Sequence, residues 1–437
     1  MTEILNWLAL FGIYISLFAS TFFLYTFFEN RKSMNGKEPK EWPSVTIAVP
    51  TYNDADTIKQ TVESLLALDY PKDRLQLMIV ENNHSTDGTY DIAKQFESND
   101  VEVYSIPQGG KGPALNFALT FAKGEFFGGL DSDSIVEPDA LKKLIEHFTS
   151  KDVMAVTPAL KVHNPKSFLG RIQQIEYMMG VFLRKVFANL NSIHVTPGPL
   201  TIYRKEFFDK YGGYDEHNIT EDLEIAMRIQ CKKFKIKNAI DANVYAANPE
   251  TWGTLARQRV RWYIGFLENM IKYKELLHPK YGLLAVYVLP MAFISIFLAT
   301  IFSAYTFYRV ILKIATLPFF FHSINYNIPA ALHNGLIQFM STSPDVKTIL
   351  AIPLIVFTMI MLYAAKSYSK EKKESWLKLG ILFIPYGIAY IYIFSIWWMM
   401  ALGYKIFARK PLRFGGTVWS NSVINSILSK RSRNEQC

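Results

Sequence analysis

The chain consists of four long apolar runs and one block in which short apolar and polar segments alternate. No charged residue interrupts the apolar runs, which cover residues 4–28, 282–308, 348–365 and 379–404. A helix that crosses a bilayer needs about 20 mainly apolar residues, and every run reaches or nearly reaches that length. The pattern therefore predicts one membrane helix before the block and three after it. Glu3 precedes the first run and no small-residue cleavage pattern follows, so we expect this helix to be retained rather than removed as a signal peptide.

Inside the block, short β-branched runs alternate with helical patterns. Val45–Pro50 and Leu75–Val80 are typical of buried strands, and Asp56–Leu68 between them has the helical period. Such alternation predicts a mostly parallel α/β sheet. Ligands of these sheets bind beyond the carboxyl ends of the strands. Four loops are expected at that edge: 51–56, 81–89, 108–112 and 131–134.

Three other segments are ambiguous in the sequence. Stretches 164–190 and 251–274 combine apolar residues at helical spacing with several basic side chains. This mixture is typical of a helix lying on a membrane surface, and it also fits a helix packed on the sheet. Segment 314–343 is apolar but interrupted by prolines, histidines and asparagines, and it fits a fifth crossing, a re-entrant segment or an external loop.

Composition and charge favour a membrane protein whose block faces the cytoplasm. The chain has 437 residues, is 50% hydrophobic and carries a formal net charge of +9. Lysines and arginines gather beside the apolar runs, in segments 31–40, 405–413 and 430–433, and such flanks mark cytoplasmic sides. Three crossings between the block and the tail do not place both in the cytoplasm, so the number of crossings stays open. No nucleic-acid-binding motif accompanies the charge, and two cysteines provide neither a disulfide framework nor a cysteine zinc site.

These patterns divide the chain into four expected regions. They are a membrane helix in 1–30, a cytoplasmic block in 43–275 that includes the amphipathic stretches, membrane helices in 280–405 and a basic cytoplasmic tail in 406–437. The expected protein is therefore a multi-pass protein of the cell membrane. We expect membrane lipids among its partners and no nucleic acid.

Two aspartates behind an apolar run form a candidate metal site. Asp131 and Asp133 are separated by one residue, so in an extended backbone both carboxylates point the same way. Such oxygen ligands suit Mg²⁺ or Mn²⁺, which proteins usually share with substrate phosphates. Lys111 lies in a glycine-rich turn before a helical segment, a setting that favours phosphate. Each motif taken singly is also compatible with a solvated turn.

Two helical segments carry further candidate chemistry. Asp222, with Glu221 beside it, begins a helical pattern, where a carboxylate either complements the helix dipole or acts as a general base toward an acceptor hydroxyl. Gln258, Arg261 and Trp262 share one helix face. An amide, a guanidinium and an indole there can hold phosphate oxygens and stack on a sugar ring, although such residues are also common on interfacial helices.

Taken in order, these motifs resemble the membrane-embedded glycosyltransferases of family 2, which include hyaluronan, chitin, cellulose and poly-N-acetylglucosamine synthases. The resemblance spans about residues 45 to 275 and is specific as a set. The matching segments are 49–54, 85–89, 110–116, 131–133, 198–204 with 212–215, 220–222 and 258–262. One departure concerns the donor's base, because Glu81, Asn82 and Asn83 stand where the family usually has Asp-Asp-Gly.

The resemblance implies an α/β GT-A fold, which is Rossmann-like with a mostly parallel sheet, plus an α-helical multi-pass membrane region with interfacial helices. It implies an inverting hexosyltransferase in which Asp133, with Asp131 nearby, holds Mg²⁺ or Mn²⁺ and Asp222 serves as base beside Glu221. Trp262 and Gly198 are the implied acceptor contacts. The implied contacts to a nucleotide-sugar donor, expected to be a UDP-sugar, are Thr51, Tyr52, Asp54, Glu81, Asn82, Lys111, Asp131, Gln258 and Arg261.

Three functions fit this reading of the chain. The first is a processive synthase that extends a polysaccharide and extrudes it through its membrane helices. The second is a non-processive enzyme that transfers one sugar to a membrane lipid, such as a polyprenyl phosphate or a ceramide-like acceptor. The third is a non-catalytic membrane scaffold or transporter. It is disfavoured because the clearest crossings are uncharged and the acidic groups gather in the block, whereas transporters place polar or charged residues inside their crossings.

Overall fold

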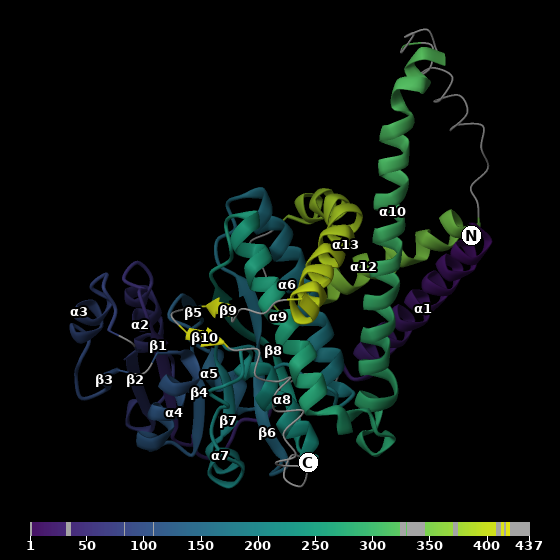
Figure 1. Ribbon diagram of the computed structural model, residues 1–437. Coiled ribbons are helices and arrows are strands. Elements are labelled where there is room, and N and C mark those ends of the chain that lie inside the picture. The colour runs from purple at the N-terminus through teal and green to yellow at the C-terminus, as the bar shows by residue number, and fades with distance from the viewer. Residues whose placement is uncertain are drawn as a thin grey trace, which may run out of the picture.

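The computed structural model describes residues 2–31, 36–82, 84–107, 109–323, 329, 346–369, 375–407, 412–414 and 417–419 (Figure 1). An α/β body contains the main sheet, and long apolar helices from both ends of the chain lie on one side of that body. Asn83, Lys32, most of segment 314–343 after Ser323 and the basic residues at 430–433 lie outside the described residues.

Eight strands form one sheet in the order β3-β2-β1-β4-β7-β6-β8-β5. The strands are β1 (Val45–Thr51), β2 (Leu75–Asn82), β3 (Val101–Ile106), β4 (Phe126–Gly129), β5 (Ser134–Val136), β6 (Val153–Val162), β7 (Thr201–Arg204) and β8 (Lys235–Ala246). β3, β2, β1 and β4 are parallel neighbours, and β6 is parallel to β8. β7 and β5 run antiparallel to their neighbours. The predicted mostly parallel sheet is confirmed, with two short antiparallel strands added to it.

Helices cover both faces of the sheet, and their buried side chains form one hydrophobic core on each face. The helices are α2 (Ile58–Leu66), α3 (Thr89–Lys94), α4 (Lys111–Phe121), α5 (Ala140–Ile145), α7 (Lys205–Tyr211) and α8 (Glu221–Cys231). Successive residues of a strand point to opposite faces, so Ile47 packs with α2, α3 and α5 while Ala48 packs with α4, α7 and α8. Every residue of β1 is buried, as expected for a parallel strand covered on both faces. The core therefore fixes the position at which β1 ends and its loop begins.

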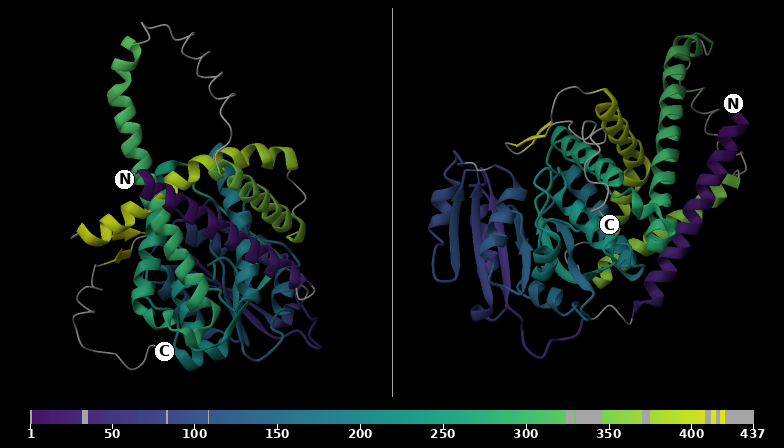
Figure 2. Two further views of the ribbon diagram at one scale, coloured as in Figure 1. Left: turned by 90° about the vertical axis from the view of Figure 1, so that its right-hand side faces the viewer. Right: turned by 60° about the horizontal axis from the view of Figure 1, so that its bottom comes forward.

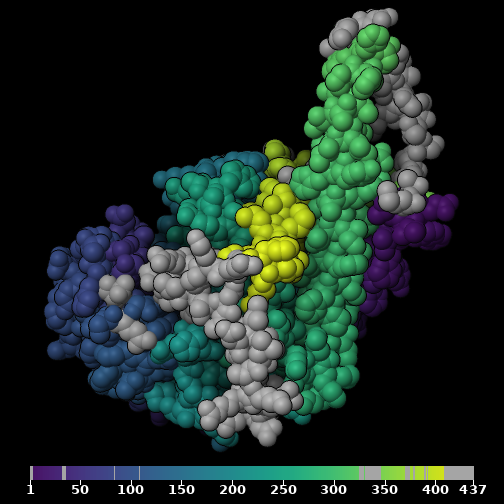
Figure 3. All heavy atoms as spheres, viewed as in Figure 1, coloured from purple at the N-terminus to yellow at the C-terminus, as the bar shows by residue number. Residues whose placement is uncertain are grey.

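Four apolar helices form the other half of the molecule: α1 (Thr2–Glu29), α10 (Leu289–Ser323), α12 (Val346–Tyr368) and α13 (Trp376–Phe407). In the described part of the chain, three segments are long and apolar enough to cross a membrane, namely Glu3–Glu29, Leu284–Ser323 and Val346–Tyr368. A fourth is reached if the two arms of α13, which meet at 46°, count as one span. Trp7 and Phe319 are 72% and 77% exposed, which suits side chains that face lipid. One end of α10 extends beyond the body (Figure 3).

The structure extends two sequence expectations. The apolar run over residues 282–308 is part of a longer helix. α10 continues to Ser323 and includes Arg309 and Lys313. The first part of segment 314–343 is therefore a continuation of that helix. The expected basic tail contains a two-stranded antiparallel sheet, formed by β9 (Leu412–Phe414) and β10 (Thr417–Trp419).

The two ambiguous amphipathic stretches form α6 (Phe168–Asn189) and α9 (Trp252–Lys272). Figure 2 shows both helices between the sheet and the apolar helices. α6 packs on β6 and β8 and also on α1, α12 and α13, and α9 packs on α8 and α13. The ring centroids of Phe182 and Phe27, which lie on α6 and α1, are 4.8 Å apart. For α6, the two open readings are therefore compatible, because one helix touches both the sheet and the apolar helices.

Candidate active site

The loop after β1 is joined to the loop after β4 by one carboxylate. Asp54 accepts hydrogen bonds from the Thr51 hydroxyl at 3.0 Å, the Tyr52 backbone N–H at 2.8 Å and the Ser132 hydroxyl at 2.6 Å. Ser132 stands between Asp131 and Asp133, so this bond fixes the acidic loop against the β1 loop. Asp54 thus holds the two loops together, in addition to the donor contact predicted from the sequence.

The side chains of Glu81 and Asn82, at the end of β2, form hydrogen bonds with other residues of the protein. Glu81 is fully buried and accepts hydrogen bonds from the Ser85 backbone N–H and the Ser105 hydroxyl, both at 2.5 Å. The Asn82 amide donates to the Thr51 carbonyl at 3.2 Å, and its oxygen accepts from the Gly110 N–H at 3.0 Å. Asn82 therefore ties the β1 end to the turn that precedes Lys111.

Lys111 lies at the meeting point of two predicted motifs. Its ammonium group is paired with the Asp131 carboxylate and lies 3.2 Å from Glu221 Oε1. Burial opposes the charge on Lys111, but the carboxylates of Asp131 and Glu221 raise its pKa above the ordinary value. A Cβ at Gly198 would overlap the Lys111 ammonium and approach Asp131 Oδ2 to 3.2 Å. The segment at residue 198 can approach this pair closely only because it has no side chain there.

Asp133 has the electrostatic character of a cation ligand. The residue is exposed, yet desolvation of its carboxylate, together with the negative charges of Asp131 and Asp54, raises its pKa to about 6. Within the described part of the chain, its carboxylate accepts one hydrogen bond, from the Ser134 hydroxyl at 3.2 Å. A divalent cation would relieve this crowding of negative charge, so the residues fit Mg²⁺ or Mn²⁺. Among the described residues no group of three or more His, Cys, Asp or Glu side chains is placed to hold a metal, so phosphate oxygens and water would complete the coordination.

Asp222 is a half-buried carboxylate at the start of α8. Its pKa is raised to about 6, because desolvation and the charge of Glu221 together outweigh the lowering by Lys111 and Arg261. One carboxylate oxygen accepts a hydrogen bond from the Leu223 N–H at 2.8 Å, and the other oxygen accepts none from the described residues. The backbone is anchored separately, since the Asp222 carbonyl accepts the Thr196 hydroxyl at 2.6 Å. These contacts fix the position of Asp222 and leave one of its carboxylate oxygens available to accept a proton.

The α9 motif reaches the same cluster. Arg261 donates to the Ile219 carbonyl at 3.0 Å and is close enough to lower the pKa of Asp222. Gln258 and Trp262 are both in contact with Arg259, through an amide hydrogen bond of 3.2 Å and a guanidinium 4.1 Å from the ring centroid. The structure therefore joins Asp54, Asp131, Asp133, Lys111, Gly198, Glu221, Asp222 and Arg261 in one region and connects Gln258 and Trp262 to each other through Arg259.

A glycine sets the distance between α8 and α9. Thr220, which precedes α8, lies so close to Gly265 that a Cβ there would overlap the threonine side chain. Asn269, one turn further along α9, is fully buried and donates to the Thr220 hydroxyl at 3.1 Å. This close approach places Arg261, one turn earlier on the same helix, beside Asp222.

We expect Gly265→Ala to lower the transfer rate by about 10-fold to 100-fold, because displacement of α9 by a fraction of an ångström moves Arg261 away from Asp222. Alanine is otherwise favoured over glycine in a helix, so the loss would arise from the clash alone. The matched control is Gly253→Ala on the same helix, where a Cβ meets nothing within 4 Å. Steady-state kinetics of both variants test this, and equal rates for the two would contradict it.

Several site residues were not found from the sequence. Thr196 anchors the Asp222 backbone and accepts the Tyr203 hydroxyl at 2.9 Å. Arg184 and Tyr177 project from α6, and the charges of Asp222 and Asp133 act on them. In the sequence Arg184 is one of several basic residues in the amphipathic stretch 164–190, and nothing there marks it as a site residue. Membership of the cluster depends on how α6 crosses the sheet, and spacing along the chain does not reveal that.

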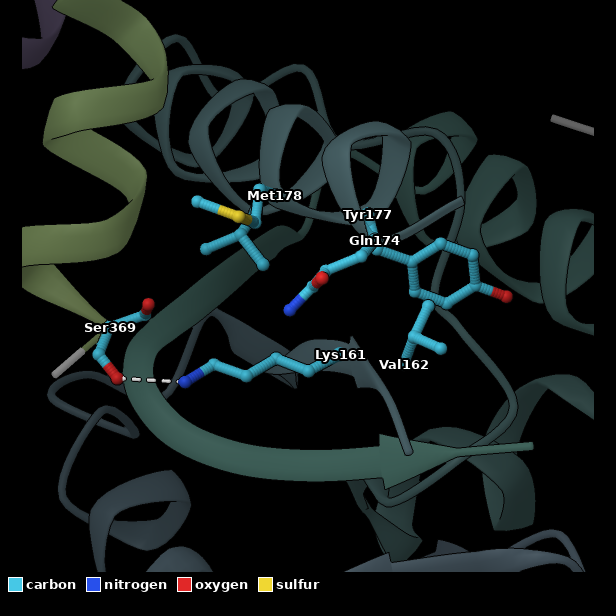
Figure 4. A pocket seen from close by; sticks show the side chains of 7 residues that line it. Lys161, Val162, Gln174, Tyr177, Met178 and Ser369 are labelled. Atoms are coloured by element: carbon cyan, nitrogen blue, oxygen red, sulfur yellow. Dashed lines mark hydrogen bonds between the residues drawn. The ribbon is translucent and has the colours of Figure 1, made fainter. Parts of the chain in front are cut away.

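A small cavity lies beside this cluster, between β6, α6 and the end of α12 (Figure 4). Lys161 extends across it and donates to the Ser369 carbonyl at 3.0 Å, and Gln174 and Tyr177 line another part of it. Its volume of about 20 Å³ holds roughly one water molecule. It is too small for a sugar and is not the donor site.

Comparison with known proteins places this arrangement in a family. Residues 46–212 match the model of glycosyl transferase family 2. A poly-beta-1,6-N-acetyl-D-glucosamine synthase of Staphylococcus epidermidis is 30% identical over 283 residues, which are 62% of this chain and 67% of that protein. The chain belongs to glycosyltransferase family 2. The synthase of the same name from Staphylococcus aureus is 31% identical to this glycosyltransferase over 279 residues, with the same two coverages.

A solved structure supports the fold independently. A mannosyltransferase from Pyrobaculum calidifontis, in complex with GDP-Man and Mn²⁺, covers 85% of the glycosyltransferase and the whole of its own chain. The TM-score is 0.51 at 21% sequence identity. The predicted GT-A fold and the assignment as a family 2 glycosyltransferase are therefore confirmed. The roles of the individual site residues and the division into four regions remain predictions.

Proposed function

We propose that this glycosyltransferase transfers a sugar, with inversion, from a nucleotide-sugar to a growing polysaccharide and passes the product through its membrane helices. The observation that carries the proposal is the convergence of Asp131, Lys111, Asp222 and Arg261, from four distant segments, beside a helix that packs on α13. Phosphate-binding and proton-accepting groups thus adjoin an apolar helix bundle. The names of the related synthases support a polysaccharide product.

In the proposed mechanism, Asp222 accepts the proton of the acceptor hydroxyl while that oxygen forms a bond to the anomeric carbon of the donor sugar. The bond between this carbon and the diphosphate oxygen breaks, and its electron pair leaves with the nucleoside diphosphate. Attack opposite the leaving group inverts the anomeric centre. Lys111 and Arg261 supply fixed positive charge near the diphosphate, and such fixed charges lower the barrier without reorganisation.

Asp133 and Asp131 would hold Mg²⁺ or Mn²⁺ together with donor phosphate oxygens. When bound, the cation neutralises the leaving diphosphate. Because the related synthases are named for a polymer of N-acetyl-D-glucosamine, whose common activated form is a uridine diphosphate, the proposed donor is a UDP-sugar. The proposed topology has the α/β body in the cytoplasm, where nucleotide-sugars are made.

The proposal is tested with the purified full chain in lipid, supplied with a panel of UDP- and GDP-sugars and with Mg²⁺ or Mn²⁺. Released nucleotide and product size are measured together. A long polymer from one donor supports the proposal. A single sugar recovered in the lipid extract supports the non-processive alternative instead, and absence of transfer from every donor contradicts both.

The rate of transfer should depend on pH through the ionisation of the Asp222 carboxylate. Its carboxylate must be ionised to accept a proton, and burial raises its pKa to about 6. At saturating divalent cation we therefore expect the rate to fall about tenfold for each pH unit below 6 and to be nearly flat from about 7 to 8. A rate–pH profile of the full chain in lipid checks this, and a rate that is constant from pH 5 to 8 would contradict the role of Asp222.

A further inference from the structure

Arg259 is a buried cation inside the α9 motif. Only 1% of the residue is exposed, although it belongs to a helix that the sequence presents as amphipathic. A guanidinium that is withdrawn from water is costly unless charged and polar partners surround it. The position therefore requires an explanation that neither the phosphate contacts nor the base of the proposed mechanism provides.

The partners of Arg259 come from two other helices. Its Nη2 donates to Glu176 Oε2 on α6 at 2.7 Å, and the Tyr390 hydroxyl of α13 donates to the same oxygen at 2.5 Å. These contacts join positions 83 and 214 residues apart in the sequence. One carboxylate thus connects the α9 motif to the α/β body through α6 and to an apolar helix through α13.

Arg259 also fixes the two motif residues predicted to face substrate. Its guanidinium covers one face of the Trp262 ring at 4.1 Å from the centroid, so a sugar can stack only on the opposite face. Its Nη1 donates to the Gln258 side-chain oxygen at 3.2 Å, which turns the amide in a defined direction. Lysine could not reproduce this, because only a planar guanidinium can stack on a ring and donate in several directions at once.

Tyr390 lies in the break between the two arms of α13, which cover 379–387 and 392–407. Tyr390 and Trp397 of this helix share an apolar cluster with Leu169 and Ile172 of α6 and Leu255 of α9. The hydroxyl of Tyr390 is therefore a polar contact within an otherwise apolar packing, placed where the helix changes direction.

We propose that Glu176, Arg259 and Tyr390 form a positioning unit that holds the acceptor-stacking face of Trp262 at a fixed place relative to α13. This inference rests on the proposed function, in which Trp262 stacks on the acceptor glycan. The unit keeps the growing end of the glycan aligned both with Asp222 and with the apolar helices along which the product leaves. All three are positioning residues, since they act through Trp262 and Gln258 rather than by touching the reacting atoms.

The test uses Tyr390→Phe, Glu176→Gln and Arg259→Lys in the full chain in lipid, with purified acceptor oligosaccharide and the UDP-sugar that the donor panel identifies. Each variant should raise the KM for acceptor about 10-fold to 100-fold and shorten the product. Donor binding, measured with the nucleotide-sugar alone, should stay at the level of the unchanged protein. Matched controls are Tyr392→Phe on the same helix and Arg257→Lys on the exposed face of α9, and both should behave like the unchanged protein.

The outcomes separate this inference from the proposed function. If Tyr390→Phe keeps the acceptor KM and the product length of the unchanged protein, the positioning unit is overturned. If the variants lose donor binding and acceptor affinity together with thermal stability, the network is merely structural and the inference is overturned as well. If the unchanged protein transfers from no nucleotide-sugar, the proposed function fails, and the inference that rests on it fails with it.

Discussion

Asp222→Asn should abolish sugar transfer while leaving donor binding intact. The amide has nearly the same shape as the carboxylate and can keep the contact to the Leu223 N–H, but it cannot accept a proton. General bases typically contribute 10²-fold to 10⁴-fold to a rate, so we expect a loss of at least about 100-fold in kcat. The measurement is released nucleotide under saturating donor and acceptor, with donor affinity determined in parallel.

The control for this variant is Asp209→Asn on α7. Asp209 is an exposed aspartate whose partner is Lys205 at 3.0 Å, and loss of a surface pair of this kind changes little. Asp209→Asn should therefore retain normal kinetics. Transfer at the normal rate by Asp222→Asn would remove Asp222 as the base, whereas loss of donor binding in the same variant would indicate a disturbed pocket rather than a missing base.

Removal of divalent cations should stop transfer, and Asp133→Asn should have a similar effect. Asp133 is an exposed carboxylate that is crowded by the negative charges of Asp131 and Asp54, which is a favourable setting for a cation and an unfavourable one for an isolated anion. We expect chelation to reduce the rate by at least about 100-fold and added Mg²⁺ or Mn²⁺ to restore it. The variant should need far more cation than the unchanged protein.

The matched control is Asp139→Asn, which alters an exposed carboxylate that pairs with Lys143 at 2.7 Å. Its dependence on cation concentration should equal that of the unchanged protein. Cation binding can also be measured directly, by calorimetry in the presence of donor nucleotide. Full activity in the presence of chelator, or an unchanged cation requirement in Asp133→Asn, would contradict the predicted role of Asp133.

The sequence predicted those parts of the fold that depend on local pattern. Strands such as β1 were recognisable because consecutive β-branched residues fill both faces of a covered parallel strand. The loops at the strand ends followed from that assignment, and the Asp131–Lys111 pair confirms that two of these loops meet. The apolar helices followed from their length and lack of charge.

The remaining features depend on contacts between distant segments. The antiparallel strand β7 lies between β4 and β6. The hydrophobic pattern of a strand does not predict whether it runs parallel or antiparallel to its neighbours. Arg259 was interpreted only as part of an amphipathic helix, because its partners Glu176 and Tyr390 lie far away in the sequence. The uncharged run in the sequence stops at residue 308, whereas α10 continues past Arg309 and Lys313 to Ser323. Three-dimensional packing decides each of these cases.

The charge balance of the pocket has a consequence for how affinities should be measured. Among the described residues, five carboxylates face three cationic side chains there: Asp54, Asp131, Asp133, Glu221 and Asp222 against Lys111, Arg184 and Arg261. A negatively charged nucleotide-sugar and a divalent cation must then assist one another thermodynamically, and the factor by which each raises the other's affinity is the same in both directions. A dissociation constant for the sugar nucleotide therefore has meaning only at a stated concentration of free metal.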